Sequence, residues 1–124
     1  TQQRSDALIY CDGDGACKDS RMQAKTIQCQ GKRSCKNAII QPNAGDELEL
    51  LECQGWFGCA TTNVIMAKEI RAYGFNGLAG AIIETRGIPE FTLKAYGFRA
   101  LAGTTIDCKG STCNIDCKGN ACKN

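Results

Sequence analysis

Apolar and polar residues alternate in short segments that recur along the chain. In the first of these segments, IYCDGDGAC, an apolar residue, a cysteine and a glycine occupy alternate positions from Ile9 to Gly13. A period of two residues is typical of a β-strand with one buried face, whereas a helix has a period of 3.6. A glycine inside a helix also costs about 1 kcal/mol relative to alanine. The pattern therefore predicts short strands rather than helices.

Five segments follow one rule: an apolar residue, any residue, Cys or Ala, any residue, Gly, three residues, and Cys or Leu. They begin at Ile9, Ile27, Leu51, Ile70 and Leu93, at intervals of 18, 24, 19 and 23 residues. Intervals of this length are typical of solenoids, in which each repeat forms one turn. We therefore expect an all-β fold, a single-stranded parallel β-solenoid whose turns stack about 4.8 Å apart. A right-handed β-helix is the expected form, because parallel crossovers are nearly always right-handed.

Stacking the segments predicts columns of like residues inside the coil. One column contains the apolar residues at the segment starts, and another contains the glycines Gly13, Gly31, Gly55, Gly74 and Gly97. Further along each turn, an apolar residue recurs and predicts a second inward-facing strand. The apolar members of that strand are Met22, Ile40, Val64, Ile83 and Ile106.

Ten cysteines and no histidine indicate a disulfide framework formed in an oxidising compartment. Two turns lack cysteine, and in each of them both positions change together, to Ala72 with Leu78 and to Ala95 with Leu101. We expect this paired replacement if the two cysteines of one turn form one inward bridge. Cysteines stacked in neighbouring turns would also satisfy the Cα separation of a disulfide, so a cross-turn ladder is the alternative.

Pairing within turns is favoured because each N-terminal column contains three cysteines, and pairing along a column would leave one of them alone. The expected bridges are Cys11–Cys17, Cys29–Cys35, Cys53–Cys59, Cys108–Cys113 and Cys117–Cys122. A bridge that closes a loop of this size contributes roughly 2 kcal/mol in the chain-entropy model. Such bridges would stiffen each turn locally.

The length of the chain predicts one solenoid domain, spanning residues 1–124. We expect an N-terminal segment at 1–8, repeat turns at 9–106 and shortened, disulfide-locked C-terminal turns at 107–124. The last boundary depends on the tripeptide Ile-Asp-Cys at 106–108, which recurs at 115–117. A tapered end of this kind would protect the open strand edge of a solenoid.

The outward positions predict a charged column and an aromatic strip. The charged column contains Glu52, Arg71, Lys94 and Asp107, and its expected role is a solvated face whose cross-strand pairs support the register. Aromatic residues in neighbouring columns are the alternative, as an exposed strip for a neighbouring subunit or for sugar rings. This candidate interaction surface consists of Trp56, Tyr73, Phe75, Tyr96 and Phe98.

No catalytic residue, metal site or cofactor is expected, and we do not expect an enzyme. Without histidine, a Ser-His-Asp or Cys-His device cannot form within the chain. The cysteine spacing does not match zinc ligand pairs, and DGDG at 12–15 lacks the spaced acidic ligands and closing glutamate of a calcium loop. The spacing of the charged residues does not distinguish a catalytic group from a solvated face; the residues considered are Glu47, Glu49, Glu52 and Arg71.

Composition also disfavours several partners. A net charge of +2 does not favour nucleic acid, and the apolar runs are too short to favour membrane insertion. The opening TQQRSDA has neither Met nor an apolar signal region, so we expect a mature or excised chain. Adjacent threonines at 61–62 and 104–105 have no counterparts in the other turns, which disfavours a continuous ice-binding array.

The phrase CxGxxxCxxxxI, interleaved with turns of the kind AYGFxxLxGxTI, resembles the cysteine-rich tandem-repeat surface and extracellular proteins of algae and other protists. The resemblance covers residues 9 to 122 and implies a secreted or cell-surface β-solenoid. We therefore expect a structural protein, a rod, coat or filament subunit that self-associates through its ends or its aromatic strip. The alternative is a carbohydrate- or ice-binding module that uses one flat face.

Overall fold

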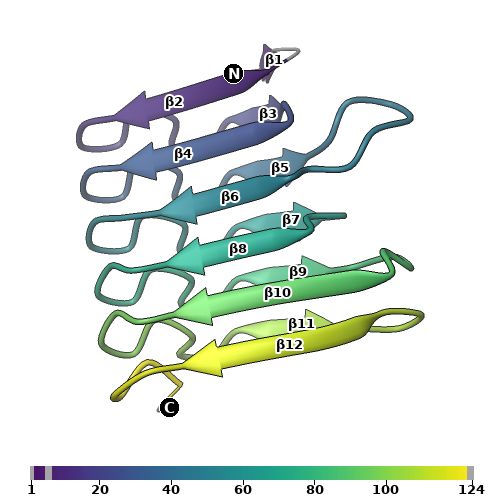
Figure 1. Cartoon of the computed structure of the whole chain (residues 1–124). Coiled ribbons are helices and arrows are strands. Elements are labelled where there is room, and N and C mark those ends of the chain that lie inside the picture. The colour runs from purple at the N-terminus through teal and green to yellow at the C-terminus, as the bar shows by residue number, and fades with distance from the viewer. Residues whose placement is uncertain (1, 5–6, 123–124) are drawn as a thin grey trace.

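The computed structural model describes residues 2–4 and 7–122, which form a coil of stacked turns with two six-stranded parallel sheets (Figure 1). The chain crosses from one sheet to the other after every strand. The first sheet contains β1 (Gln2–Arg4), β3 (Arg21–Gln23), β5 (Ile39–Gln41), β7 (Asn63–Ile65), β9 (Ile82–Glu84) and β11 (Thr105–Asp107). The second contains β2 (Leu8–Asp12), β4 (Thr26–Gln30), β6 (Leu50–Cys53), β8 (Glu69–Ala72), β10 (Glu90–Ala95) and β12 (Thr112–Cys117).

Each strand that is not at the edge of its sheet pairs in parallel with the strand one turn before it and with the strand one turn after it, and like residues are aligned. Ile27 pairs with Ile9 on one side and with Leu51 on the other. In Figure 1 the front strands run to the left and the rear strands run to the right as the coil descends from the N-terminus, which is a right-handed winding. The disulfide-braced parallel β-solenoid expected from the sequence is therefore confirmed.

Inward side chains fill the interior of the coil. Along β10, the side chains of Phe91, Leu93 and Ala95 are fully buried and alternate with more exposed residues. In the first sheet, Met22 and Ile40 are aligned and fully buried in the same way. Burying one large aliphatic or aromatic side chain stabilises a fold by about 1.5–3 kcal/mol. Repetition of these columns in every turn therefore supplies one continuous core along the axis.

The glycine column lies where the backbones of successive turns come into close contact. The Cβ of an alanine at Gly31 would lie 2.8 Å from the backbone nitrogen of Gly13, and one at Gly55 would lie 2.5 Å from the backbone oxygen of Gly31. At Gly74 and Gly97 the added Cβ would strike the backbone of the glycine one turn earlier. These positions require glycine because any side chain would force the turns apart.

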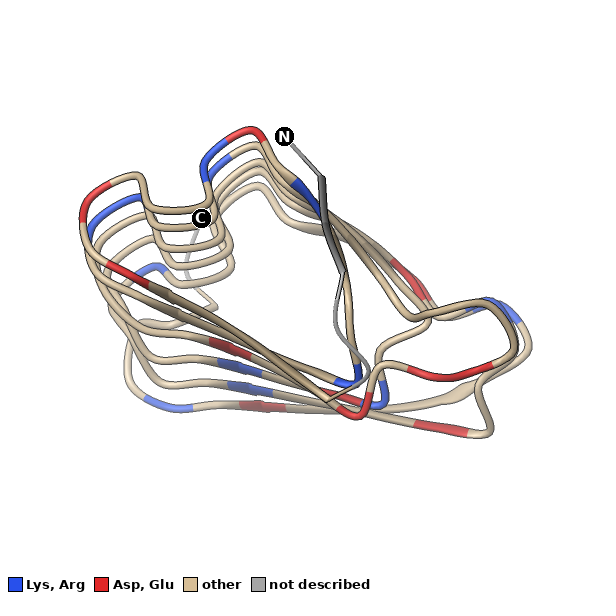
Figure 2. Cartoon of the chain, turned by 90° about the horizontal axis from the view of Figure 1, so that it is seen from above, with Lys and Arg blue, Asp and Glu red and all other residues tan. Residues whose placement is uncertain are grey.

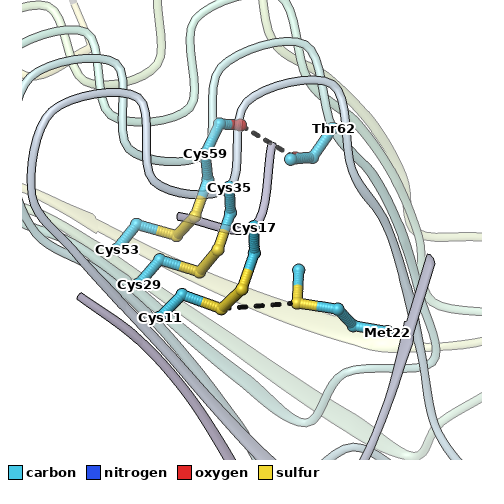
Figure 3. Close-up of a disulfide and its surroundings, with 8 residues drawn as sticks. All are labelled: Cys11, Cys17, Met22, Cys29, Cys35, Cys53, Cys59 and Thr62. Atoms are coloured by element: carbon cyan, nitrogen blue, oxygen red, sulfur yellow. Dashed lines mark hydrogen bonds between the residues drawn. A yellow bond between two sulfur atoms is a disulfide. The ribbon is translucent and has the colours of Figure 1, made fainter. Parts of the chain in front are cut away.

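Three of the disulfides stack at one corner of the coil (Figure 3). Their Cα separations are 5.8, 5.9 and 5.8 Å, and each joins two cysteines of the same turn. The pairs are Cys11–Cys17, Cys29–Cys35 and Cys53–Cys59. The structure therefore has the pairing within turns that the sequence favoured over a cross-turn ladder.

In the next turn, an apolar pair occupies the space of a bridge. Ala72 is aligned with Cys53 in the strand ladder, and both residues are fully buried. Leu78 is fully buried as well, whereas Leu101, one turn nearer the C-terminal end, is partly buried against the core. The same interior space is thus filled by a disulfide in some turns and by an apolar pair in others.

The C-terminal part of the coil corrects one part of the expectation of shortened turns at 107–124. β12 is aligned with β10, so that Ile115 lies beside Leu93 and Cys117 lies beside Ala95. Ile115 therefore begins a further segment 22 residues after Leu93. Its corner is one residue shorter than the earlier ones, because Cys117 and Cys122 are separated by 5 positions and Cys53 and Cys59 by 6. Ile106 instead lies on β11, beside Ile83 in the first sheet. The two Ile-Asp-Cys tripeptides thus lie on different faces and are not successive repeats.

This alignment also changes two details of the sequence interpretation. Asp116, not Asp107, follows Lys94 in the charged column, because Asp107 lies in the first sheet beside Glu84. The Cys108–Cys113 bridge, with a Cα separation of 6.2 Å, closes the corner between β11 and β12. The Cys117–Cys122 bridge lies at the other corner, in the column of the first three bridges, but two turns with Ala72 and Ala95 in place of cysteine separate it from them.

Candidate functional site: an exposed aromatic corner

The aromatic residues lie at the corner that follows the strands of the second sheet. In the first five turns this corner has one length, with five residues between the two inward positions, and it repeats as a step in the outline seen along the coil (Figure 2). Its backbone forms a ladder: the Phe57 N–H donates to the Phe75 carbonyl at 2.9 Å, and the Asn76 N–H donates to the Phe98 carbonyl at 3.0 Å. This ladder aligns the side chains of successive turns.

Two columns of rings result from this alignment. In the inner column, Tyr73 stacks on Tyr96 with a centroid separation of 5.3 Å and an interplanar angle of 12°. In the outer column, Phe75 stacks on Phe98 at 5.4 Å and 6°. Trp56 extends the outer column. Its ring centroid lies 5.6 Å from that of Phe75, and the two rings are tilted by 49°. The five aromatic residues that the sequence predicted as one surface thus form two stacks at the same corner, one of tyrosines and one of Trp56, Phe75 and Phe98.

Phe57 is a sixth member that the sequence analysis missed. Its ring meets Phe75 edge-on at a centroid distance of 5.9 Å. The consecutive aromatic residues Trp56 and Phe57 were the available signal in the sequence. The repeat pattern did not align Phe57 with an aromatic residue of another turn. We call these residues the aromatic corner: Trp56, Phe57, Tyr73, Phe75, Tyr96 and Phe98.

The aromatic corner is partly open to solvent. Trp56 is 60% exposed, Phe98 is 49% exposed and Tyr96 is 37% exposed. Phe75 lies between Trp56 and Phe98, and it is only partly exposed, as is Tyr73. An exposed aromatic cluster of this kind is typical of a contact surface.

Charged groups border the aromatic corner on its C-terminal side. The Tyr96 hydroxyl donates to Asp116 Oδ2 at 3.0 Å, and Lys118 Nζ lies 5.0 Å from the Tyr96 ring centroid. The hydrogen bond to Asp116, together with partial burial, raises the pKa of Tyr96 above its ordinary value. Asp116 and Lys118 therefore hold the Tyr96 ring in position.

Ion pairs continue along the outward face of the second sheet. Arg71 Nη1 lies 3.8 Å from Glu52 Oε2, and its Nε donates to Glu69. The hydrogen bond to Glu69 raises the pKa of Arg71 despite partial burial. Glu52 and Arg71 thus have one another as partners, which fits the register-supporting face expected from the sequence.

A groove of about 760 Å³ lies at the opposite corner, beside the loop at residues 42–49. Its lining includes Gln41, Asn43, Glu47, Met66 and Lys68. Glu47 Oε1 and Lys68 Nζ form an ion pair at 3.1 Å. The interval of 24 residues in this turn was the sequence signal for an enlarged loop, although the groove itself was not predicted. This ion pair holds the loop to the next turn.

Comparisons with known proteins give this chain no relative. No family model matches it, and no curated protein or solved structure matches it. The resemblance to repeat proteins of algae and other protists therefore stays a prediction. Across residues 2–4 and 7–122, no helix is long and apolar enough to cross a membrane. Within the same described residues, no cluster of three or more His, Cys, Asp or Glu side chains is placed to hold a metal ion.

Proposed function

We propose that this chain is a non-enzymatic structural protein of an extracellular assembly, a rod, coat or filament subunit. The observation that carries the proposal is the continuity of both sheets along the coil, each of which ends in an edge strand at either end of the coil. An unpaired parallel edge is a template for another strand. A coil built this way supplies stiffness and a means of extension.

The disulfides support the extracellular part of the proposal. Five bridges among the ten cysteines are compatible with an oxidising environment. They brace corners of the coil, and the groove beside the loop at residues 42–49 is bordered by the ion pair of Glu47 and Lys68. A disulfide framework of this kind persists in a secreted protein.

Sedimentation and electron microscopy of the oxidised protein test the proposal. We expect the sedimentation coefficient to rise with concentration and rods of constant width to appear in micrographs. The reduced protein serves as the control, because loss of the bridges should loosen the turns and lower the yield of rods. A sedimentation coefficient that stays at the monomer value up to millimolar concentration would contradict a self-associating subunit.

A carbohydrate-binding module is the second candidate function, favoured by the exposure of the aromatic corner. Trp56 and Phe98 lie at the two ends of the outer ring column, so each has a face that no ring of that column covers. Such faces suit stacking by sugar rings. A glycan array with the protein and with Trp56→Ala/Phe98→Ala tests it: binding that disappears in the variant supports a sugar site, and silence of the parent protein excludes it.

Ice binding has less support. The outward residues aligned across the first sheet are Arg21, Ile39, Asn63, Ile82 and Thr105. This column mixes charged, apolar and polar side chains and has no threonine array. An ice-recrystallisation assay on the protein would detect such activity directly.

A further inference from the structure

We propose that copies of this chain associate head to tail, with β12 of one copy pairing in parallel, in register, with β2 of the next copy. The proposal rests on the proposed structural function, and it names the partner as a second copy of this chain and the site as the two ends of the coil. Its contacts follow from the columns that already connect neighbouring turns.

The edge strands of the two sheets are arranged for such a joint. β1 and β11 are the edges of the first sheet, and β2 and β12 are the edges of the second. Because the path alternates between sheets, the strand that would follow β12 along the coil belongs to the first sheet, and β1 of another copy is such a strand. Axial stacking therefore continues both sheets at once.

The backbone groups at the two ends are complementary. Within the coil, Tyr96 N–H donates to the Ala72 carbonyl and Lys118 N–H donates to the Ala95 carbonyl, each at 3.0 Å. The same pattern across the joint pairs Asp12 N–H of the second copy with the Cys117 carbonyl of the first. Both groups belong to edge strands.

The side chains at the two ends are complementary as well. Ile115 is 47% exposed at the C-terminal end, and in the joint it lies beside Ile9 of the next copy, which is 6% exposed, as Leu93 lies beside Ile70 within the coil. In the outward column, Lys118 of one copy lies beside Asp12 of the next, and both side chains are exposed. One register therefore both covers Ile115 and places opposite charges side by side.

The symmetry of this contact predicts an open assembly. The two surfaces are different ends of the molecule, so the contact is heterologous, and repetition along a common axis does not close. Copies therefore add without limit, and a rod results from one contact. Lateral association through the aromatic corner or the first sheet is the competing arrangement.

A matched pair of substitutions distinguishes end-to-end from lateral contact. Ile115 at the coil end and Ile82 on the outer face of the first sheet are equally exposed, at 47% each. Ile115→Lys is expected to reduce association at least ten-fold, measured by sedimentation, whereas Ile82→Lys leaves it unchanged. Equal effects of the two substitutions, or a larger effect at Ile82, would overturn the end-to-end contact.

Cysteine crosslinking tests the register without depending on stability. Leu8 and Asn114 occupy the same outward column, so Leu8→Cys/Asn114→Cys places two cysteines in adjacent turns of neighbouring copies, with their Cα atoms about 4.8 Å apart along the axis. This spacing lies within the range that a disulfide accepts. In the control Leu8→Cys/Thr92→Cys, the second cysteine lies one turn further from the joint, because Thr92 pairs with Asn114.

The expected result is a covalent ladder of oligomers from the first variant alone, with mass spectrometry identifying a peptide in which the two introduced cysteines are joined. Rods that form without this link would overturn the register and leave the proposed structural function intact. A protein that forms neither rods nor the link at high concentration would overturn both. Equal crosslinking of the control variant would also contradict the register.

A charge exchange checks the Lys118–Asp12 contact independently. Lys118→Asp and Asp12→Lys are each expected to weaken association by roughly two- to five-fold, as for an exposed ion pair, and the double exchange is expected to restore it. The effect should shrink at high salt. Single exchanges with no effect at low salt would contradict this pairing.

Discussion

The turns that begin at Ile9, Ile27 and Leu51 have a disulfide at the corner that follows their strand in the second sheet. The turns that begin at Ile70 and Leu93, called here the bridge-free turns, have none at that corner, and yet their strands are aligned in the same sheet. The bridged turns have sulfur in the interior space that Ala and Leu fill in the others. The bridge-free turns also carry the two stacked ring pairs on their outer surface. The path of the coil therefore depends on its columns of inward-facing residues and not on a covalent link in every turn.

The glycine column is common to the bridged and the bridge-free turns, so a substitution in it should have the largest effect on stability. Gly74→Ala is expected to prevent native stacking, because the new Cβ would strike the Gly55 carbonyl. We expect loss of the cooperative thermal transition in circular dichroism. Gly77→Ala is the matched control, since the next turn already has Ala100 at the equivalent position, and an equal loss in that variant would contradict the steric explanation.

The apolar filling of the bridge-free turns is the next largest effect. Leu78→Ala should lower the free energy of unfolding by about 2–5 kcal/mol, because it removes a fully buried side chain and leaves a cavity. Leu101→Ala is expected to cost less, since Leu101 is partly exposed near the open end. Urea denaturation of both variants measures the difference. Equal losses would show that the interior is packed alike along the whole axis.

A disulfide introduced into a bridge-free turn tests whether the two kinds of turn have the same interior space. Ala72→Cys/Leu78→Cys should form a disulfide like that of the preceding turn, where the Cα separation is 5.8 Å. Closing a loop of this size should raise the free energy of unfolding by roughly 2 kcal/mol relative to Ala72→Ser/Leu78→Ser, which has no sulfur to bridge. Denaturation of the two variants measures this gain. A variant that oxidises without gaining stability would indicate that the interior space differs between the turns.

Much of the fold could be predicted because the local period and the repeat agree. Apolar residues at alternate positions specified the strands, and recurring glycine specified the register. The C-terminal end was misread because each turn has two inward strands, and the motif Ile-Asp-Cys occurs once on each. A period of two cannot distinguish Ile106 from Ile115, whereas the ladder places them in different sheets.

The candidate site could be predicted in part. The spacing of Tyr73, Tyr96 and their neighbours placed the rings in columns, because equal corner lengths keep side chains aligned. The edge-on contact of Phe57 and the pairing of Tyr96 with Asp116 depend on side-chain rotation and on the true position of the last strand. Neither is contained in a linear pattern of residues. The groove at residues 42–49 depends on loop shape, which repeats do not specify.

The smallest expected effect concerns Tyr96, on the outer surface of a bridge-free turn. Its pKa is raised because the phenol donates a hydrogen bond to Asp116 and is partly shielded. The contribution to stability is therefore present below the unfolded pKa of about 10 and is lost as pH rises through the raised folded value. Ultraviolet titration of Tyr10→Phe/Tyr73→Phe, which keeps Tyr96 as its only tyrosine, follows this ionisation directly. Adding Asp116→Ala should lower the midpoint, and the urea-unfolded protein gives the reference; a midpoint unchanged by Asp116→Ala would mean that shielding, rather than the hydrogen bond, holds the proton.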